Sequence, residues 1–169
     1  MSAGLLPRDR VFVNFKDYLV DYARKWVHIS PYALTTPGSS DPDIIAAVMN
    51  SVPYRNGHVG GGVDPNGTIH GPYRIECISP QDYEPMAAGD AIERFNRWVA
   101  THTSDSAALT VLLSAEVRRR LSEADAVYVL RDLGDSAVCD YGRIHDEFNE
   151  FLTIDRASGN VAVIVASDD

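Results

Sequence analysis

The last third of the chain holds four short apolar or alternating runs, and these constrain the fold more than any other feature. The runs are Val127–Leu130, Ala137–Tyr141, Phe148–Ile154 and Val161–Val165. Short runs of this kind are typical of β-strands, and the segment DRASGN at 155–160 has the composition of a tight turn. We therefore expect an antiparallel meander. Residues 144–152 also fit helical spacing, and here we favour a strand from Phe148 onward.

The first half of the chain has helical patterns. Apolar residues, many of them aromatic, recur at intervals of three and four over 11–27, which predicts an amphipathic helix. A second helix is expected over 42–51. Ser40 or Asp41 is placed to cap it, and Pro42 lies in its first turn, where a missing N–H costs nothing.

The middle of the chain adds further elements. Pro85 opens a third helical stretch, Ala107–Leu113 reads as a buried strand, and Ser114 is placed to cap a fourth helix. Helical patterns therefore come first and strands dominate the end. This segregation predicts an α+β fold, in which a mostly antiparallel sheet carries about four helices packed on one face. We expect a single domain over residues 1–169.

The stretch GHVGGGVDPNGTIHG at 57–71 concentrates glycine and two histidines. It lacks the strand–glycine–helix order of a dinucleotide site and the lysine of a phosphate loop. Asp64–Gly67 instead fits a turn, which predicts a glycine-rich hairpin with HVGGGV and TIHGPYRIE as its arms. In that register His58 faces Tyr73 or Arg74, and His70 faces Gly61 or Gly62. The two imidazoles then lie roughly 10–13 Å apart, too far to share a metal.

Three consecutive glycines, Gly60, Gly61 and Gly62, are unusual in a strand. Such a run marks either a bulge or close packing, which we favour, or a surface that a ligand or partner approaches closely. The sequence contains no zinc-type cysteine pair or helical metal motif, so we expect neither a metal nor a cofactor. Cys77 and Cys139 are expected to be reduced thiols.

The formal net charge of −9 argues against nucleic-acid binding, because phosphates require a basic surface. The longest apolar run, Val161–Ala166, is far shorter than the roughly 20 residues of a membrane span. The first residues, MSAGLLPRDR, lack the pattern of a secretory signal, so a cytoplasmic location is the default expectation. An acidic charge fits either simple solubility or attraction to a basic protein.

The segment YGRIHDEFNEF gathers the second set of reactive side chains. His145, Asp146, Glu147 and Glu150 lie close together there, and Asp140 comes just before them. A carboxylate on the mainly apolar face of a strand is a candidate general acid or base. The simpler interpretation is a charged edge strand whose acids discourage pairing between edges. His28, and likewise His102, is expected just past the end of a helix.

Two functions remain in view. The first is a small acidic domain that binds and neutralises or positions another protein, with Asp140, Asp146, Glu147, Glu150 and the Gly60–Gly62 surface as contact candidates. The second is a small-molecule-binding domain or enzyme with a pocket between the hairpin and the sheet. Its catalytic candidates are His145, Asp146, His58 and His70. A structural or assembly role is the remaining alternative, and homo-oligomer formation stays open.

Overall fold

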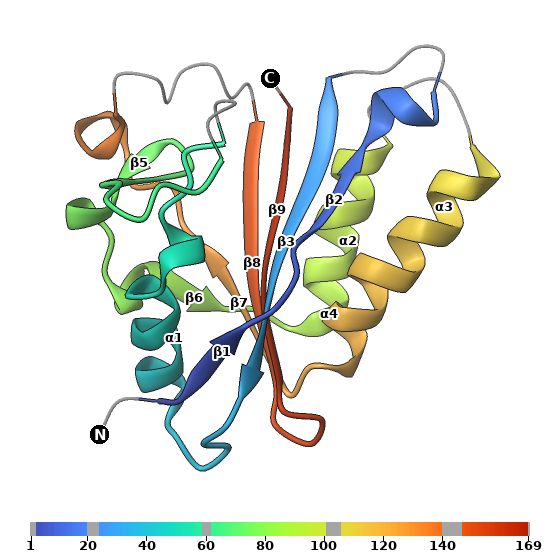
Figure 1. The fold of residues 1–169 in the computed structure, drawn as a ribbon. Helices are drawn as coiled ribbons and strands as arrows, with labels where there is room; N and C mark the ends of the chain where they lie inside the picture. Colours follow the sequence, from blue (N-terminus) through green and yellow to red (C-terminus); the bar gives the residue numbers. More distant parts are fainter. Residues whose placement is uncertain (1–2, 20–23, 59–61, 101–105, 140–146, 169) are drawn as a thin grey trace.

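The computed structural model describes residues 3–19, 24–58, 62–100, 106–139 and 147–168. Its centre is a seven-stranded sheet in the order β1-β3-β9-β8-β7-β6, with β2 also paired to β3 (Figure 1). All pairings in the sheet are antiparallel. Its strands are β1 (Leu5–Pro7), β2 (Val11–Asn14), β3 (Lys25–Leu34), β6 (Tyr83–Pro85), β7 (Ala126–Leu130), β8 (Glu147–Asp155) and β9 (Asn160–Asp168). The α+β class with a mostly antiparallel sheet is confirmed.

The expected C-terminal meander is present as β7, β8 and β9. The tight turn between β8 and β9 also forms, and Gly159 supplies the positive φ of 71° that it requires. The predicted strand at Ala137–Tyr141 is wrong for its described residues. Ala137 ends a 3-10 turn (Asp135–Ala137), and Val138 makes only an isolated bridge to Tyr73.

Two of the predicted helices are confirmed. Helix α1 spans Asp41–Met49, and the hydroxyl of its N-cap Ser40 accepts from the Asp43 N–H at 3.2 Å. Helix α2 spans Ala88–Val99, just after the predicted start at Pro85. Helix α3 (Ala107–Leu113), a π-helical stretch (Ser114–Arg118) and α4 (Arg119–Glu123) follow one another without a break. The described residues therefore form three separate helical segments, where about four were expected.

Two assignments by periodicity are wrong. The segment 11–27 is not a helix, because its described parts form β2, a 3-10 turn (Phe15–Asp17) and the start of β3. Residues 25–30 of β3 are all buried, so both strand faces carry apolar side chains and the alternation typical of strands is hidden. Ala107–Leu113 is a helix rather than a strand. Its alanines and leucines are strong helix formers, and Val111 is 69% exposed.

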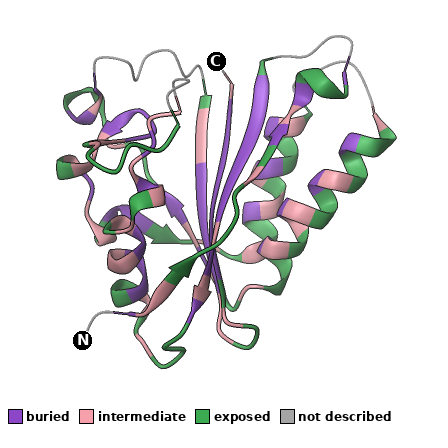
Figure 2. Ribbon diagram, viewed as in Figure 1, coloured by how far each residue is buried: buried purple, intermediate pink, exposed green. Residues whose placement is uncertain are grey.

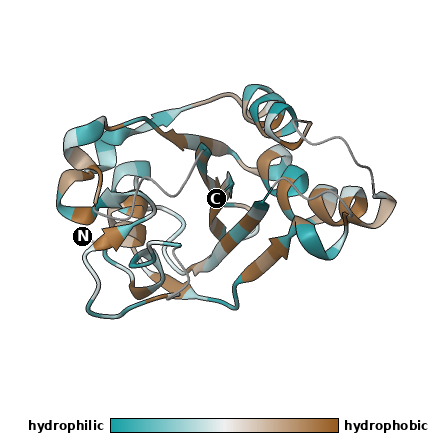
Figure 3. Cartoon of the chain, turned by 90° about the horizontal axis from the view of Figure 1, so that it is seen from above, coloured by the Kyte–Doolittle hydropathy of each residue, from teal (hydrophilic) through white to brown (hydrophobic). Residues whose placement is uncertain are grey.

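The helices cover both faces of the sheet, so the expectation of helices on one face is wrong. Helix α1 packs in one core with Tyr32 and Leu152, whereas α2, α3 and α4 pack in a second core with Ile29 and Phe151. Figure 2 shows the buried strands between these two layers, and the view from above in Figure 3 shows helices on both sides of the sheet.

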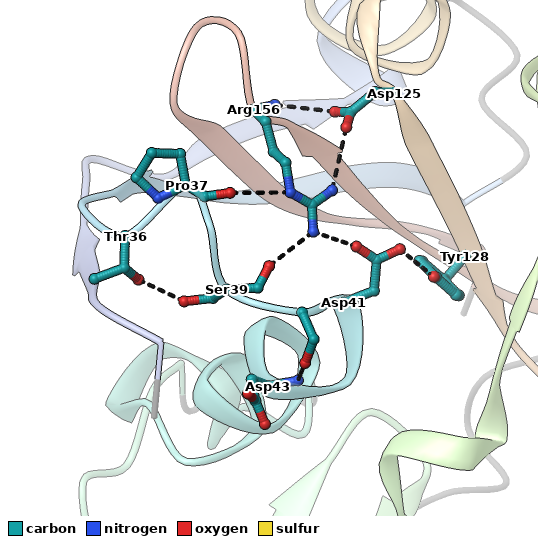
Figure 4. Close-up of polar contacts among 9 residues, drawn as sticks. Thr36, Pro37, Ser39, Asp41, Asp43, Asp125, Tyr128 and Arg156 are labelled. Carbon is teal, nitrogen blue, oxygen red and sulfur yellow. Dashed lines mark hydrogen bonds and ion pairs between the residues drawn. The ribbon is translucent and has the colours of Figure 1, made fainter. Parts of the chain in front are cut away.

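Arg156, in the turn between β8 and β9, holds the start of α1 against the sheet (Figure 4). Its guanidinium contacts Pro37 O at 3.1 Å, Ser39 O at 2.9 Å, Asp125 at 3.1 Å, and Asp41. These contacts raise the pKa of Arg156, and the hydrogen bond to Asp41 contributes most. Desolvation alone would raise the pKa of Asp125, but its hydrogen bonds with Arg156 outweigh that effect and lower it. Asp41 also accepts from the Tyr128 hydroxyl. One side chain thus joins three distant segments.

Candidate functional site

The glycine-rich stretch folds differently from the predicted hairpin. The turn at Asp64–Gly67 forms, with Gly67 N donating to Asp64 O at 2.8 Å. The paired strands, however, are β4 (Ile69–His70) and β5 (Tyr73–Arg74), so the hairpin turns at Gly71 and Pro72. His70 consequently faces Tyr73, and the predicted register is wrong.

Gly71 is required by its surroundings. Its φ is +53°, and a Cβ at this position would overlap the ring of Phe148 in β8. The hairpin backbone thus lies directly against the sheet. Of the three consecutive glycines, Gly60 and Gly61 fall outside the described residues. Gly62 has φ +67° and open space around it, and it lines a pocket of about 580 Å³ with Cys139.

The hairpin brings His70 to Glu150 of β8 in a closed ring of hydrogen bonds. His70 Nδ1 lies 2.7 Å from the carbonyl of Tyr54, which can only accept, so Nδ1 carries a proton. Nε2 contacts the Glu150 carboxylate, and the Tyr83 hydroxyl donates to the other carboxylate oxygen. The Tyr54 and Tyr83 hydroxyls are 2.7 Å apart. Because Tyr83 donates to Glu150, Tyr54 must donate to Tyr83.

This ring, which we call the His70–Glu150 network, is sealed from solvent. His70 is 2% exposed and Glu150 is 1% exposed. Burial raises the pKa of Tyr54 and Tyr83 well above the usual range, so both hydroxyls stay protonated. Every member has a partner, which is the condition under which a buried polar network stabilises a fold. Glu150 does lie on a mainly apolar strand face, as predicted, but it is not available as a surface contact.

A second group of rings lies beside this network and was not predicted. Trp26 and His28 of β3 contact the His58 ring, with centroid distances of 5.1 and 4.9 Å. The ring centroid of Phe12, in β2, lies 6.1 Å from that of Trp26 and 6.4 Å from that of His28. Phe12 is 51% exposed. We call these four residues the aromatic cluster. His58 has φ +57°, an uncommon conformation for a residue other than glycine.

His28 is the least satisfied member of the aromatic cluster. It is 4% exposed, and its Nε2 has no hydrogen-bond partner within the described part of the chain. Burial lowers the pKa of His28 to about 4, helped by the positive charge of Arg10 and by His70. The ring is therefore neutral at pH 7. His28 lies in the middle of a strand, so its predicted place after a helix is wrong.

Sheet register explains why the two groups are neighbours. Val165 of β9 pairs with Glu150 on one side and with His28 on the other, so the three form one row across the sheet. The signal available in the sequence was the alternation of Trp26, His28, Ser30 and Tyr32, which a helical interpretation of the same segment hides.

The remaining candidates are placed as follows. Glu147 is exposed at the start of β8, opposite Asp168 of β9. Asp140, His145, Asp146 and His102 fall outside the described residues. The residues that are described contain no group of three or more histidine, cysteine, aspartate or glutamate side chains that could hold a metal ion. Cys77 and Cys139 are free thiols.

Comparisons with known proteins add no relative. The chain matches no protein-family model, no curated protein and no solved structure. Within the described ranges, each helix is too short or too polar to traverse a lipid bilayer. The fold and the site therefore define only a class, an α+β protein with an antiparallel sheet covered on both faces.

Proposed function

We propose that this chain is an acidic protein-binding domain that binds and neutralises or positions a partner protein, in the manner of an immunity protein or chaperone. The observation that carries the proposal is the exposure of Phe12, the member of the aromatic cluster that lies at the edge of the sheet. Aromatic side chains of this kind are the usual anchors of protein interfaces. A cytoplasmic location belongs to the same proposal, and the two free thiols, Cys77 and Cys139, are consistent with it.

The surroundings of Phe12 support an interface at this edge. Strands β1 and β2 both pair with β3 and form the outer edge of the sheet. Leu6 of β1 is 60% exposed and Phe12 of β2 is 51% exposed, so two large apolar side chains project from this edge. An exposed sheet edge can bind an extended segment of another chain through its backbone groups.

Burial and charge support binding over catalysis. The histidine and carboxylate that do come together, His70 and Glu150, are 2% and 1% exposed and cannot reach a substrate without rearrangement. The net charge of −9 would attract a basic partner and would make association faster at low salt. Glu147, which is exposed, remains the contact candidate among the described acidic residues of the 140–150 segment.

The experiment uses a photoreactive benzoylphenylalanine at Phe12 and, as a matched control, at Val52. The two native side chains are 51% and 48% exposed, but Val52 lies in the 3-10 turn that follows α1 and is not part of a strand. Cross-linked proteins from cells of the source organism are identified by mass spectrometry. The candidate partner is then purified, and its binding is measured by calorimetry at low and high salt.

The proposal expects cross-links from Phe12 that are absent from Val52. It also expects at least about tenfold weaker binding of the purified partner after Phe12→Ser, the loss of a typical interface anchor. Glu147→Lys should weaken binding less and reduce the dependence on salt. Equal cross-linking from both positions, or unchanged affinity after Phe12→Ser, would refute an interface at this edge.

A second candidate, a small-molecule-binding domain or enzyme, is favoured by two observations. His28 Nε2 has no partner among the described residues, and the neighbouring His58 has a left-handed backbone. Uncommon backbone conformations cluster at functional sites. A metabolite library screened by thermal shift tests this candidate. Compounds that raise the melting temperature of the wild type and of Val52→Ser, but not of His58→Ala, would support it, and the absence of any such compound would reject it.

A further inference from the structure

A polar pocket of about 510 Å³ lies on the other face of the sheet, between the β1–β2 edge and α4. Its charged lining residues are Arg8, Asp9, Arg119, Arg120, Glu123 and Asp155. None of these belongs to the His70–Glu150 network or to the aromatic cluster. The pocket is within the size range of small-molecule sites, which is roughly 300–1,000 Å³.

The floor of the pocket follows from the sheet register. Ala162 of β9 pairs with Pro31 of β3 on one side and with Thr153 of β8 on the other, and all three line the pocket. These side chains are small, whereas the same face carries Phe151 and Ile164 farther along the strands. The space arises because this row does not fill the gap below α4. Thr153 is 4% exposed and adds a hydroxyl to the floor.

The charges come from three separate elements. Arg8 and Asp9 lie between β1 and β2, Arg119 and Glu123 lie on α4, and Asp155 ends β8. The ion pairs of the two α4 arginines stay within the helical segment, from Arg119 to Glu123 at 3.4 Å and from Arg120 to Glu116 at 3.5 Å. No ion pair between described residues crosses the pocket from one wall to another.

Guanidinium and carboxylate groups thus face one small space without neutralising one another across it. A ligand with a single charge would satisfy one set and meet repulsion from the other. A ligand that carries both charges at opposite ends can pair its carboxylate with an arginine and its ammonium with an acid. We propose that this pocket binds a small zwitterion, an amino acid or short peptide with free termini. This inference does not depend on the proposed protein-binding function.

The experiment measures amide chemical shifts of the labelled full chain while trialanine is added. Three matched peptides accompany it: N-acetyl-trialanine, which lacks the ammonium group, trialanine amide, which lacks the carboxylate, and the doubly blocked form. We expect saturable shifts at Ala162 and Thr153 with trialanine. Blocking either end should weaken binding at least about tenfold, since each block removes a charge-assisted hydrogen bond.

Two exposed pocket residues test the location. Arg8→Gln and Glu123→Gln should each weaken trialanine binding severalfold, whereas Arg97→Gln and Asp90→Asn, exposed on α2, should not. Unchanged melting temperatures establish that the variants are folded. Absence of saturable shifts, equal binding of the blocked peptides, or equal affinity of the pocket and control variants would each overturn the proposal. A negative result for the pocket would not contradict the proposed Phe12 interface, because the two tests substitute different residues.

Discussion

The two faces of the sheet bury cores of equal size by different means. Among the described residues, each core contains eighteen buried apolar side chains. The core under α1 includes Tyr32, Tyr54, Tyr73 and Tyr83, and encloses His70 and Glu150. The core under α2–α4 has no tyrosine among its described residues. The core under α1 therefore depends on satisfied hydrogen bonds, whereas the core under α2–α4 depends on the close packing of apolar side chains.

Lys25 is a charged exception on the face under α2–α4, where the hydroxyl of Thr153 is also buried. Lys25 is 1% exposed, and its Nζ lies 3.7 Å from Asp168 and 4.4 Å from the centre of the Trp98 ring. Desolvation lowers the pKa of Lys25, against the opposing effects of Asp168 and Glu147. The exception lies at the end of the sheet, so it leaves the centre of this core apolar. A new cavity should therefore be most damaging in the core under α2–α4, and an unpaired polar atom most damaging in the core under α1.

The largest effect is expected in the core under α2–α4. Phe151→Ala removes a fully buried ring and should reduce the free energy of unfolding by about 3–5 kcal/mol, because the packed side chains cannot collapse into the space. Urea unfolding at pH 7 measures it. Val111→Ala, on the same face but 69% exposed, is the control and should change stability by less than about 0.5 kcal/mol. A loss below about 1 kcal/mol for Phe151→Ala would show that this core repacks freely.

On the polar face, the chemistry of Glu150 should matter more than its volume. Glu150→Leu leaves His70 Nε2 without a partner and removes the acceptor of the Tyr83 hydroxyl, which keeps its contact with Tyr54, and should cost about 2–5 kcal/mol. Glu150→Gln can donate to a neutral His70 and accept from Tyr83, so it should cost less than about 1 kcal/mol. Urea unfolding of both variants compares them. Equal losses would mean that His70 requires a carboxylate, as a charged imidazolium would.

Acid should destabilise the polar face through His28. Its pKa is lowered from 6.5 to about 4 in the folded state, so the folded protein binds fewer protons than the unfolded chain between these values. The contribution is fully present above pH 6.5 and is lost as pH falls toward 4. It amounts to about 3 kcal/mol, at 1.36 kcal/mol per pKa unit. His28→Gln should lack this part of the pH dependence of unfolding, and an identical pH profile in both proteins would contradict the assignment.

The smallest effect tests a single hydrogen bond beneath α1. Ser51 donates to Val48 O at 2.6 Å, so the buried Tyr32 hydroxyl, 2.7 Å from Ser51 Oγ, is the donor of that pair. Tyr32→Phe removes this bond and leaves Ser51 satisfied, and should cost about 0.5–1.5 kcal/mol. Thermal unfolding at pH 7 is the measurement. A loss as large as that of Glu150→Leu would mean that the hydroxyl supports more than one contact.

Local signals in the sequence predicted the elements that short motifs define, such as a helix cap or a tight turn. Ser40 and Pro42 marked the start of α1, and the turn at 155–160 marked the meander. Residues 11–27 were misassigned because β3 is buried on both faces. Val27 and Ile29, which lie between Trp26, His28 and Ser30, are also buried, so the alternation is not marked by exposed polar residues. The assignment of helices to one face failed for a related reason, since β3, β8 and β9 present apolar residues on both sides.

The site was less predictable than the fold, because its contacts are long-range. His70 and Glu150 are separated by 80 positions, and only the antiparallel register of β8, β9 and β3 places Glu150 in the same row as His28. Each residue was visible as a titratable group, but nothing in its neighbourhood in the sequence identified its partner. The same holds for Arg8 and Glu123, which line one pocket although they are far apart in the sequence.

The position of β9 has a consequence for how the chain reaches this structure. It comes last in the order of the strands but lies between β3 and β8, and its residues Val163 and Ile164 point into opposite cores. During synthesis, neither hydrophobic layer can close before this segment leaves the ribosome. Until then the unpaired sides of β3 and β8 are open to wrong pairing.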